Sequence, residues 1–173
     1  QIYNQTKSYL KNPQPVSDTL LYGEFHENSK HTTRMPYMKP VYDVLEKNRG
    51  KVIYFDFWAR WCPPCLAEME PLKQLRSKFS TDDLIIYSIC VSEPKEQWEE
   101  CLNEYSLKNR GIECVHVTDY LGIDNYQKIR KQWKIDRMPY YVLINRKGQI
   151  IDFGTAARPS NPQLVSRIEE AVK

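Results

Sequence analysis

The stretch that decides the fold spans residues 52–65 and reads VIYFDFWARWCPPC. Its first seven residues are apolar except for Asp56, which is typical of a central strand that is covered on both faces. Two cysteines, Cys62 and Cys65, follow the strand with two prolines between them. This spacing lets both thiols lie on the first turn of a helix, close enough to form and reopen a small disulfide ring. A strand that ends at such a pair indicates a redox-active dithiol.

The helix expected to begin at this pair favours reactivity of the first cysteine. Pro63 is tolerated at the helix start because its missing N–H would have no partner there in any case. In the N-cap position, Cys62 faces the positive end of the helix dipole, which lowers the pKa of a thiol and supplies the thiolate that attacks disulfides. The pattern therefore predicts thiol–disulfide exchange, in which Cys62 attacks and Cys65 resolves.

A Cys-x-x-Cys pair can also form half of a zinc site, but such a site needs two further Cys or His ligands at a suitable spacing. The remaining candidates include no second closely spaced pair: Cys101, Cys114, His26, His31 and His116. Attachment of haem needs a histidine after the second cysteine, and Leu66 occupies that position. We therefore expect no metal site and no cofactor beyond the redox-active disulfide of Cys62 and Cys65, with zinc as the lesser alternative.

Length and charge are those of an ordinary soluble domain. The 173 residues correspond to one domain, and 25 Lys and Arg against 22 Asp and Glu give a net charge of +3 without a basic block. This distribution gives no support to nucleic-acid binding. No apolar run approaches the ~20 residues that span a bilayer, and no charged-then-apolar leader opens the sequence. The start at Gln1 rather than Met is compatible with a mature or excised portion of a protein.

Three further cysteines lie in apolar patterns away from the pair. The total of five is odd, so at least one thiol is unpaired, and a dense disulfide scaffold is excluded. Cys90 ends a strand-like run, Cys101 lies on the apolar face of a helical pattern, and Cys114 lies within residues 112–117. We expect each of them to be a small buried core residue rather than a functional thiol.

Periodicity along the chain predicts alternating strands and helices. Residues 1–35 are polar and turn-rich and are expected to form an irregular or partly helical lead-in, with the folded domain at residues 36–173. The predicted elements are helices at 35–48, 62–79 with a kink at Pro71, 94–107, 125–133 and from Asn161 onward, and strands at 52–58, 84–91, 112–117, 140–144 and 149–153. The predicted class is α/β, with a sheet that is parallel early and antiparallel in the final hairpin.

Two segments together resemble the thioredoxin fold: residues 57–65 (FWARWCPPC) and residues 137–140 (RMPY) ahead of the final hairpin. The strand and helix around residues 94–117 and the segment 154–160 (GTAARPS) resemble an insertion and an ending of the TlpA/ResA-like extracytoplasmic thiol-disulfide oxidoreductases of bacteria. The likeness covers about residues 36–173. It implies an α/β thioredoxin fold in which helices flank a mixed central sheet, with a TlpA/ResA-like inserted strand–helix element.

The resemblance also implies how a substrate is held. Pro139 is expected to be cis and to lie over the dithiol, so that the backbone of Met138 can pair with an extended segment of the substrate. Sequence alone shows only an X-Pro bond, for which the trans form is the more common. The remaining residues expected to contact the substrate are Trp61, Pro63 and Pro64.

Two carboxylates are candidates for proton transfer. Asp56 matches the buried Asp of thioredoxins, and Glu68, one helical turn after Cys65, matches a Glu of the TlpA/ResA-like proteins. Either could accept the Cys65 proton, because a carboxylate with a raised pKa suits proton transfer near neutral pH. The alternative makes Asp56 a hydrogen-bonded structural acid and Glu68 an exposed helix acid. Trp58 and Trp61 are expected to give the dithiol an apolar rim.

The leading hypothesis is an enzyme that exchanges disulfides with protein partners, is supplied by an upstream thiol-disulfide electron donor, and lies outside the cytoplasm as the resemblance implies. The reducing direction is favoured because Pro63 and Pro64 supply no N–H to stabilise a thiolate. A peroxiredoxin-like peroxidase would require Thr or Ser three residues before a lone attacking Cys, where this chain has Ala59. A non-enzymatic metal-carrier or interaction module is the remaining alternative.

Overall fold

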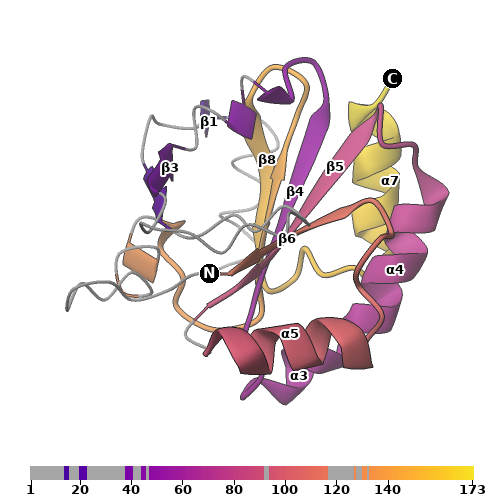
Figure 1. Ribbon diagram of the computed structural model, residues 1–173. Coiled ribbons are helices and arrows are strands. Elements are labelled where there is room, and N and C mark those ends of the chain that lie inside the picture. Colours follow the sequence, from indigo (N-terminus) through magenta and orange to yellow (C-terminus); the bar gives the residue numbers. More distant parts are fainter. Residues whose placement is uncertain are drawn as a thin grey trace.

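A six-stranded sheet in the order β1-β8-β7-β4-β5-β6 forms the centre of the protein (Figure 1). The computed structural model describes residues 14–15, 20–22, 38–40, 44–45, 47–91, 94–116, 127, 130–131 and 133–173. The strands of the sheet are β1 (Gln14–Pro15), β4 (Val52–Trp58), β5 (Leu84–Cys90), β6 (Ile112–His116), β7 (Tyr140–Ile144) and β8 (Gln149–Gly154). A second, two-stranded sheet pairs β2 (Leu20–Tyr22) with β3 (Met38–Pro40).

The sheet is mixed, as predicted. β4, β5 and β6 run parallel, whereas β7 lies antiparallel against the other side of β4 and pairs antiparallel with β8. β4 is buried along its whole length and β5 along nearly all of it, as their continuous apolar sequences predict for parallel strands that are covered on both faces. The α/β class and the final hairpin are therefore confirmed.

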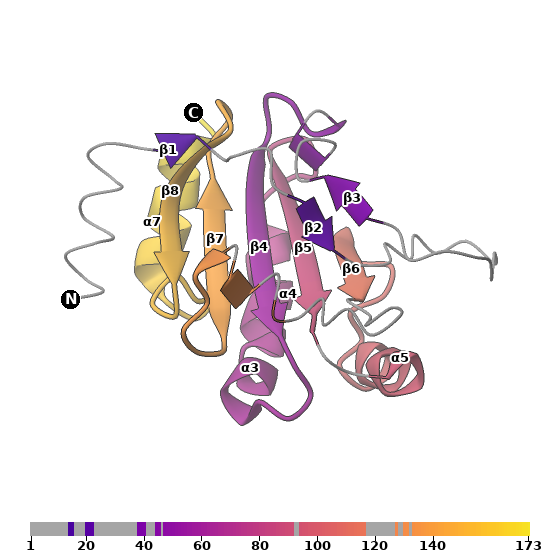
Figure 2. The same cartoon turned by 90° about the vertical axis from the view of Figure 1, so that its left-hand side faces the viewer.

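The helices with bounds among the described residues are α3 (Pro63–Ala67), α4 (Met69–Lys78), α5 (Lys95–Glu104) and α7 (Pro162–Ala171). α4 and α7 cover one face of the sheet, and β2 and β3 lie on the side of the other face (Figure 2). α3 and α5 both lie at the end of the sheet where β4 ends. The first residues of α3 are therefore held at the edge of the domain rather than against the middle of the sheet.

Alternation along β4 divides its side chains between two halves of the core. Tyr54 stacks on Tyr141 of β7 with ring centroids 5.8 Å apart. Phe55 and Phe57 instead contact Trp133, at centroid distances of 5.6 Å and 6.0 Å. Since successive residues of a strand point to opposite faces, Asp56 shares the face of Tyr54 and Tyr141.

The single helix predicted at residues 62–79 is wrong in one respect, because it is divided into α3 and α4. The break lies at Glu68, which ends α3 and begins α4, rather than at Pro71. A proline lacks the N–H that would bond the carbonyl four residues earlier, here that of Ala67, and its ring clashes with that carbonyl. The effect of Pro71 therefore falls one turn before the proline itself.

Two predictions near the N-terminus need correction. Within the lead-in predicted as irregular or partly helical, the described residues 14–15 and 20–22 are strands, and β1 extends the main sheet by pairing with β8. Within the helix predicted at 35–48, residues 38–40 form β3, while 44, 45 and 47 are helical. Pairing with another strand outweighs weak local helix signals. The domain boundary at residue 36 stays a prediction, and much of the helix predicted at 125–133 lies outside the described residues.

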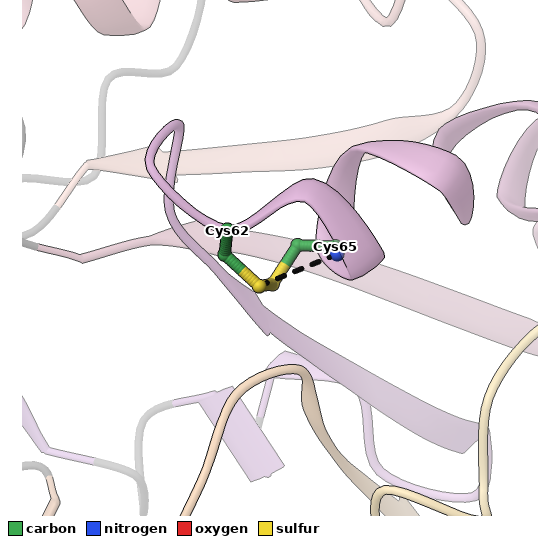
Figure 3. The surroundings of a disulfide bond; sticks show 2 residues. All are labelled: Cys62 and Cys65. Carbon is green, nitrogen blue, oxygen red and sulfur yellow. Dashed lines mark hydrogen bonds between the residues drawn. A yellow bond between two sulfur atoms is a disulfide. The ribbon is translucent and has the colours of Figure 1, made fainter.

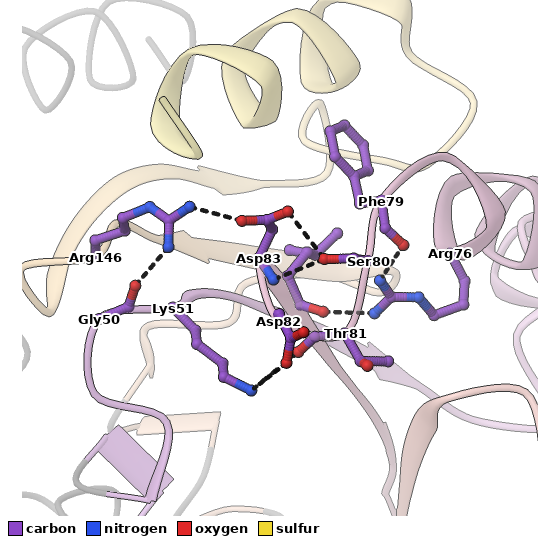
Figure 4. A network of polar contacts seen from close by, with 10 residues as sticks. Gly50, Lys51, Arg76, Phe79, Ser80, Thr81, Asp82, Asp83 and Arg146 are labelled. Atoms are coloured by element: carbon purple, nitrogen blue, oxygen red, sulfur yellow. Dashed lines mark hydrogen bonds and ion pairs between the residues drawn. The ribbon is translucent and has the colours of Figure 1, made fainter.

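A polar network holds together the end of the sheet where β4 and β5 begin (Figure 4). Arg146, in the turn between β7 and β8, donates hydrogen bonds to the carbonyl oxygens of Gly50 and Val172, both at 2.6 Å, and to the Asp83 carboxylate at 2.8 Å. Nearby, the buried Arg76 donates to two carbonyl oxygens, those of Leu84 and Phe79. These contacts lie at the end of β4 opposite to the cysteine pair.

Candidate active site

Cys62 and Cys65 form a disulfide where β4 gives way to α3, with their Cα atoms 5.3 Å apart (Figure 3). Cys62 is the N-cap of α3: its backbone is extended, and its Sγ accepts a hydrogen bond from the Cys65 N–H at 3.3 Å. Pro63 and Pro64 occupy the first two helical positions, where an N–H has no partner within the helix. The predicted N-cap position of Cys62 is confirmed.

The disulfide is largely covered by protein. The exposed fraction is 4% for Cys62 and 2% for Cys65, so the expected attacking cysteine is only marginally the more accessible. Its neighbours Pro63 and Pro64 are exposed, and 55% of Trp61 is exposed. The accessible surface around the disulfide is thus made by the residues next to the cysteines rather than by the sulfur atoms.

The two tryptophans predicted to flank the dithiol lie in different environments. Trp61 is exposed beside Cys62, as expected of a rim residue. Trp58 is fully buried, and its Nε1–H donates a hydrogen bond to the Ser88 hydroxyl at 2.8 Å. The prediction for Trp58 is therefore wrong, because β4 continues through residue 58 and its alternation turns this side chain into the core.

The second segment predicted for the site lies at the same end of the sheet. The Met138–Pro139 peptide bond is cis, as expected. That Pro139 lies over the dithiol stays a prediction. Pro139 is buried and Met138 is half-buried. Pro139 directly precedes β7, whose first residue, Tyr140, pairs with Phe57 near the end of β4. The register of β4 and β7 thus brings the two motifs, far apart in sequence, to one edge of the domain.

Asp56 is buried in β4, on the same face of the sheet as Tyr54 and Tyr141. Its carboxylate accepts a hydrogen bond from the Ser88 hydroxyl at 3.4 Å. Burial raises the pKa of Asp56 from 3.8 to about 7; the Ser88 hydrogen bond opposes this rise, and the Glu68 carboxylate adds to it. A carboxyl group that exchanges its proton near neutral pH has the property required of the predicted proton acceptor.

Glu68, at the junction of α3 and α4, is held by the segment that precedes α7. One carboxylate oxygen accepts the backbone N–H of Ser160 at 2.9 Å, and the other accepts the Ser160 hydroxyl at 2.7 Å. The side chain is partly exposed, and its charge acts on the buried Asp56. Glu68 therefore joins the start of α4 to the segment before α7 and lies within electrostatic reach of the core.

The segment that contains the dithiol, the cis proline and both carboxylates matches the sequence profile of one family, described as Redoxin, over residues 39–172. The chain belongs to the Redoxin family. The match extends from β3 to the end of α7 and so includes every residue predicted for the site.

Proteins similar to this Redoxin chain are named as thiol-disulfide oxidoreductases or thiol:disulfide interchange proteins. The thiol-disulfide oxidoreductase ResA of Bacillus anthracis is 26% identical over 108 residues, which cover 62% of this chain and 57% of that protein. The alignment thus spans less than two thirds of the relative's length. A thiol:disulfide interchange protein from a Bacteroides species is 18% identical, with a TM-score of 0.67 over 92% of this chain and 90% of its own. The thioredoxin domain of a Bacteroides vulgatus thiol-disulfide oxidoreductase is 21% identical, with a TM-score of 0.62 over 75% of this chain and 84% of its own. The predicted thioredoxin fold is confirmed.

The other three cysteines of the Redoxin domain are outside this disulfide. Cys90 and Cys101 are buried, whereas Cys114 is half-buried rather than fully buried as expected. Burial raises the pKa of Cys114 to about 12, with smaller contributions from the negative charges of Glu113 and Asp56. This thiol therefore stays protonated near neutral pH and is a poor nucleophile.

The described residues hold neither a cluster of metal-binding side chains nor a membrane-spanning helix. Within that part of the chain, no group of three or more His, Cys, Asp or Glu side chains is placed to hold a metal ion. Two of the predicted zinc candidates, His26 and His31, lie outside the described residues. None of the helices that the structure describes is long and apolar enough to cross a membrane.

Sequence reasoning missed Ser88, which links Trp58 to Asp56. Its hydroxyl accepts from Trp58 and donates to Asp56, and it is fully buried. A signal exists, since Ser88 is a small polar residue within an otherwise apolar strand. Its partner was not predictable, because the register that places Ser88 opposite Asp56 is set by the packing of β4 against β5.

Proposed function

We propose that the chain is a thiol-disulfide oxidoreductase that exchanges disulfides with protein partners through Cys62 and Cys65. The observation that carries the proposal is the disulfide at the start of α3, in which Cys62 is the N-cap and its Sγ accepts the Cys65 N–H. The same end of the sheet carries the cis Pro139, and a buried acid with a pKa near neutrality lies in the strand that leads to the dithiol.

The reaction begins with the reduced dithiol. The Cys62 thiolate attacks one sulfur of the partner's disulfide, a mixed disulfide forms, and the partner's other sulfur leaves as a thiolate that takes up a proton. The Cys65 thiol then loses its proton and attacks the Cys62 sulfur. This second step closes the Cys62–Cys65 disulfide and releases the partner's remaining sulfur as a thiolate, which takes up a proton from solvent. The partner leaves as a dithiol, so two electrons pass from the protein to the partner.

Asp56 is the proposed acceptor of the Cys65 proton. The raised pKa of Asp56, caused mainly by burial, lets its carboxylate take up a proton at neutral pH and release it again. Glu68 is the second candidate that the sequence identified, and its carboxylate, held by Ser160, lies close enough to influence Asp56. We propose that Asp56 takes the proton from Cys65 and that Glu68 acts through Asp56, since Asp56 is the buried member of the pair.

The partner is proposed to bind over the exposed surface beside the disulfide. Trp61, Pro63 and Pro64 present that surface, and each is exposed. Met138 and Pro139 lie at the same end of the sheet, where the backbone of Met138 is proposed to pair with an extended segment of the partner. An extended segment offers backbone groups regardless of its sequence, so this mode of binding suits varied protein substrates.

The proposed direction is reduction, with an upstream thiol-disulfide protein as the electron donor. The N–H groups of the first turn would stabilise a Cys62 thiolate, but Pro63 and Pro64 have none, and the Cys65 N–H is the donor observed at the sulfur. A less stabilised thiolate makes the reduced form the stronger reductant. The likeness to TlpA/ResA-like proteins of bacteria supports a bacterial origin and a location outside the cytoplasm.

The activity is tested by reduction of insulin disulfides with dithiothreitol as the electron source. The wild-type protein is expected to accelerate reduction, Cys62→Ser to abolish the acceleration, and Cys65→Ser to accumulate a stable mixed disulfide visible on a non-reducing gel. Cys101→Ser, which changes a thiol outside the disulfide, is the matched control. Equal activity of all three variants would contradict the proposal, and turnover of hydrogen peroxide without insulin reduction would favour the peroxidase alternative.

Location is tested separately in the native host. A maleimide that does not cross the cytoplasmic membrane is added to intact cells after mild reduction. It is expected to label the wild-type protein at Cys62 and to leave the Cys62→Ser variant unlabelled. Labelling that appears only after the cells are broken would contradict a location outside the cytoplasm.

A further inference from the structure

Tyr141, on β7, has a buried hydroxyl whose presence packing does not explain. The side chain is 0% exposed, and its hydroxyl has no hydrogen-bond partner among the residues that the structure describes. A buried hydroxyl without a protein partner costs free energy that phenylalanine, with the same ring, would not cost. A buried polar group of this kind indicates a bound water or a functional role.

The register of the sheet places the Tyr141 side chain next to that of the buried acid. Tyr141 and Asp56 are direct partners in the antiparallel pair of β7 and β4. Side chains of such partners project from the same face, with Cβ atoms about 4.5–5.5 Å apart. The ring of Tyr141 also stacks on that of Tyr54, at an interplanar angle of 8°, which fixes its direction within the core.

Glu68 lies on the solvent side of the same group of residues. The charges of Asp56 and Glu68 both add to the effect of burial in raising the pKa of Tyr141, so the phenol lies within electrostatic reach of both carboxylates. Asp56 is buried, whereas Glu68 is partly exposed and bound to Ser160 at the surface. The phenol is thus near one carboxylate that solvent does not reach and one that it does.

We propose that Tyr141 carries protons between Asp56 and Glu68, and so connects the buried acid of the dithiol to solvent. The proposal rests on the function proposed above. When Cys65 resolves the mixed disulfide, its proton passes to the Asp56 carboxylate. Because the Tyr141 hydroxyl contacts neither carboxylate, its oxygen takes up this proton through a bound water, while its own hydroxyl proton passes through a second water to the Glu68 carboxylate and then to solvent. One proton enters the path, one leaves, and Tyr141 ends neutral.

The other titratable or charged groups that face this path are Tyr54, Asp152, Arg158 and Cys114. The pKa of Tyr54 and that of Cys114 are both raised, chiefly by burial, so these two groups stay protonated near neutral pH. Asp152 is ion-paired with Arg167 of α7. Asp56 is therefore the group expected to dominate the pH profile near neutrality.

The path is tested with Tyr141→Phe, and Tyr54→Phe is the matched control. Each variant removes one buried phenol oxygen from the same stacked pair, but the Tyr54 hydroxyl donates to the Ala157 carbonyl at 2.7 Å. Reaction of the reduced protein with an aromatic disulfide that yields a coloured thiolate reports both steps by stopped flow. The first release follows attack by Cys62, and the second follows resolution by Cys65.

In Tyr141→Phe, the second release is expected to slow by about fivefold or more at neutral pH, a part of the roughly 10²-fold that a positioned proton acceptor contributes. The solvent deuterium isotope effect on that step should rise, the first release should be unchanged, and the melting temperature should not fall. In Tyr54→Phe, the melting temperature should fall while both releases keep their rates. A purely structural role for Tyr141 would not change the isotope effect.

A second variant keeps the test independent of how Tyr141→Phe folds. Glu68→Gln should slow the same step, and the double variant should be no slower than the slower single variant, because both act on one path. Multiplied effects, an unchanged second release in Tyr141→Phe, or equal slowing in Tyr54→Phe would each overturn the path. A wild-type protein that shows no second release would overturn the proposed function instead.

Discussion

The hydroxyl of Ser88 donates a hydrogen bond to the carboxylate of Asp56 across the parallel strands β5 and β4, at 3.4 Å. The same oxygen accepts the Nε1–H of Trp58 at 2.8 Å, so the single proton of Ser88 is left to point at Asp56. One long hydrogen bond replaces little of the hydration that the carboxylate loses on burial. This explains why the pKa of Asp56 rises to about 7 rather than falling, as it does when a carboxylate accepts several N–H donors.

Asp56→Asn should slow resolution of a mixed disulfide more than its formation. The amide cannot take up the Cys65 proton, whereas the attack by Cys62 does not depend on it. Because a general base acts in its deprotonated form, the wild-type resolution rate should rise with pH through about 7, and this inflection should be absent from the variant. Stopped-flow rates of the two steps from acidic to alkaline pH decide this. Equal slowing of both steps would remove the proposed role.

The same substitution should change how stability depends on pH. The pKa of Asp56 is about 7 in the folded protein and 3.8 as the ordinary value, so the folded state keeps a proton that the unfolded chain loses between these values. Its contribution to stability is complete below about pH 4 and is lost as the pH rises to about 7. Asp56→Asn should therefore gain stability relative to the wild type over this range, by about 4 kcal/mol at most.

Urea unfolding of the oxidised protein and the oxidised variant measures this difference. Oxidation removes titration of Cys62 and Cys65 from the comparison. Unfolding free energies that run parallel from pH 4 to pH 8 in both proteins would show that Asp56 does not hold a proton in the folded state.

Local signals were enough to predict the dithiol and most of the sheet. The apolar run 52–58 and the Cys-Pro-Pro-Cys that follows it were sufficient, because a buried parallel strand and a helix N-cap are both specified by neighbouring residues. The cis Pro139 needed the resemblance to a family, since an X-Pro bond by itself does not reveal its isomer.

The register between the strands of the sheet could not be predicted from the sequence. Ser88, Asp56 and Tyr141 lie in one row across β5, β4 and β7, and only the paired sheet shows that they are neighbours. The break at Glu68 was missed for a related reason: a proline acts on the carbonyl four residues before it, so the interruption does not coincide with Pro71.

The three cysteines outside the disulfide are expected to be dispensable for turnover. Cys90, Cys101 and Cys114 should be replaceable together by Ala or Ser with insulin reduction kept, and any loss should appear in stability because Cys90 and Cys101 are buried. Activity and urea midpoint are measured on the same sample. A tenfold loss of activity in a triple variant whose midpoint is unchanged would assign one of these thiols to the catalytic cycle.

Arg146→Ala should destabilise the protein without changing its redox chemistry. The variant leaves the carbonyl oxygens of Gly50 and Val172 without this donor, at a cost of about 2 kcal/mol. Asp83→Asn removes the partly exposed ion pair with Arg146 and disturbs the hydrogen bond that Asp83 accepts from the Ser80 hydroxyl, and should still have a smaller effect. Unfolding by urea compares the two variants. If Asp83→Asn costs as much as Arg146→Ala, the ion pair rather than the backbone contacts stabilises this end of the sheet.

The redox potential of the dithiol should lie nearer the roughly −270 mV of thioredoxin than the roughly −120 mV of a strong oxidant. An N-cap side chain accepts from the N–H groups of the second and third helical residues, here Pro64, which has none, and Cys65. Pro64→Ala restores an N–H donor aimed at the Cys62 sulfur. Because the couple transfers two electrons, the potential should rise by about 30 mV for each tenfold by which this donor stabilises the reduced form. Pro63→Ala restores an N–H at the first helical position, which an N-cap does not bind, and should change it little. Equilibration in defined thiol–disulfide buffers measures all three proteins, and a wild-type midpoint above about −180 mV would reject the reducing direction.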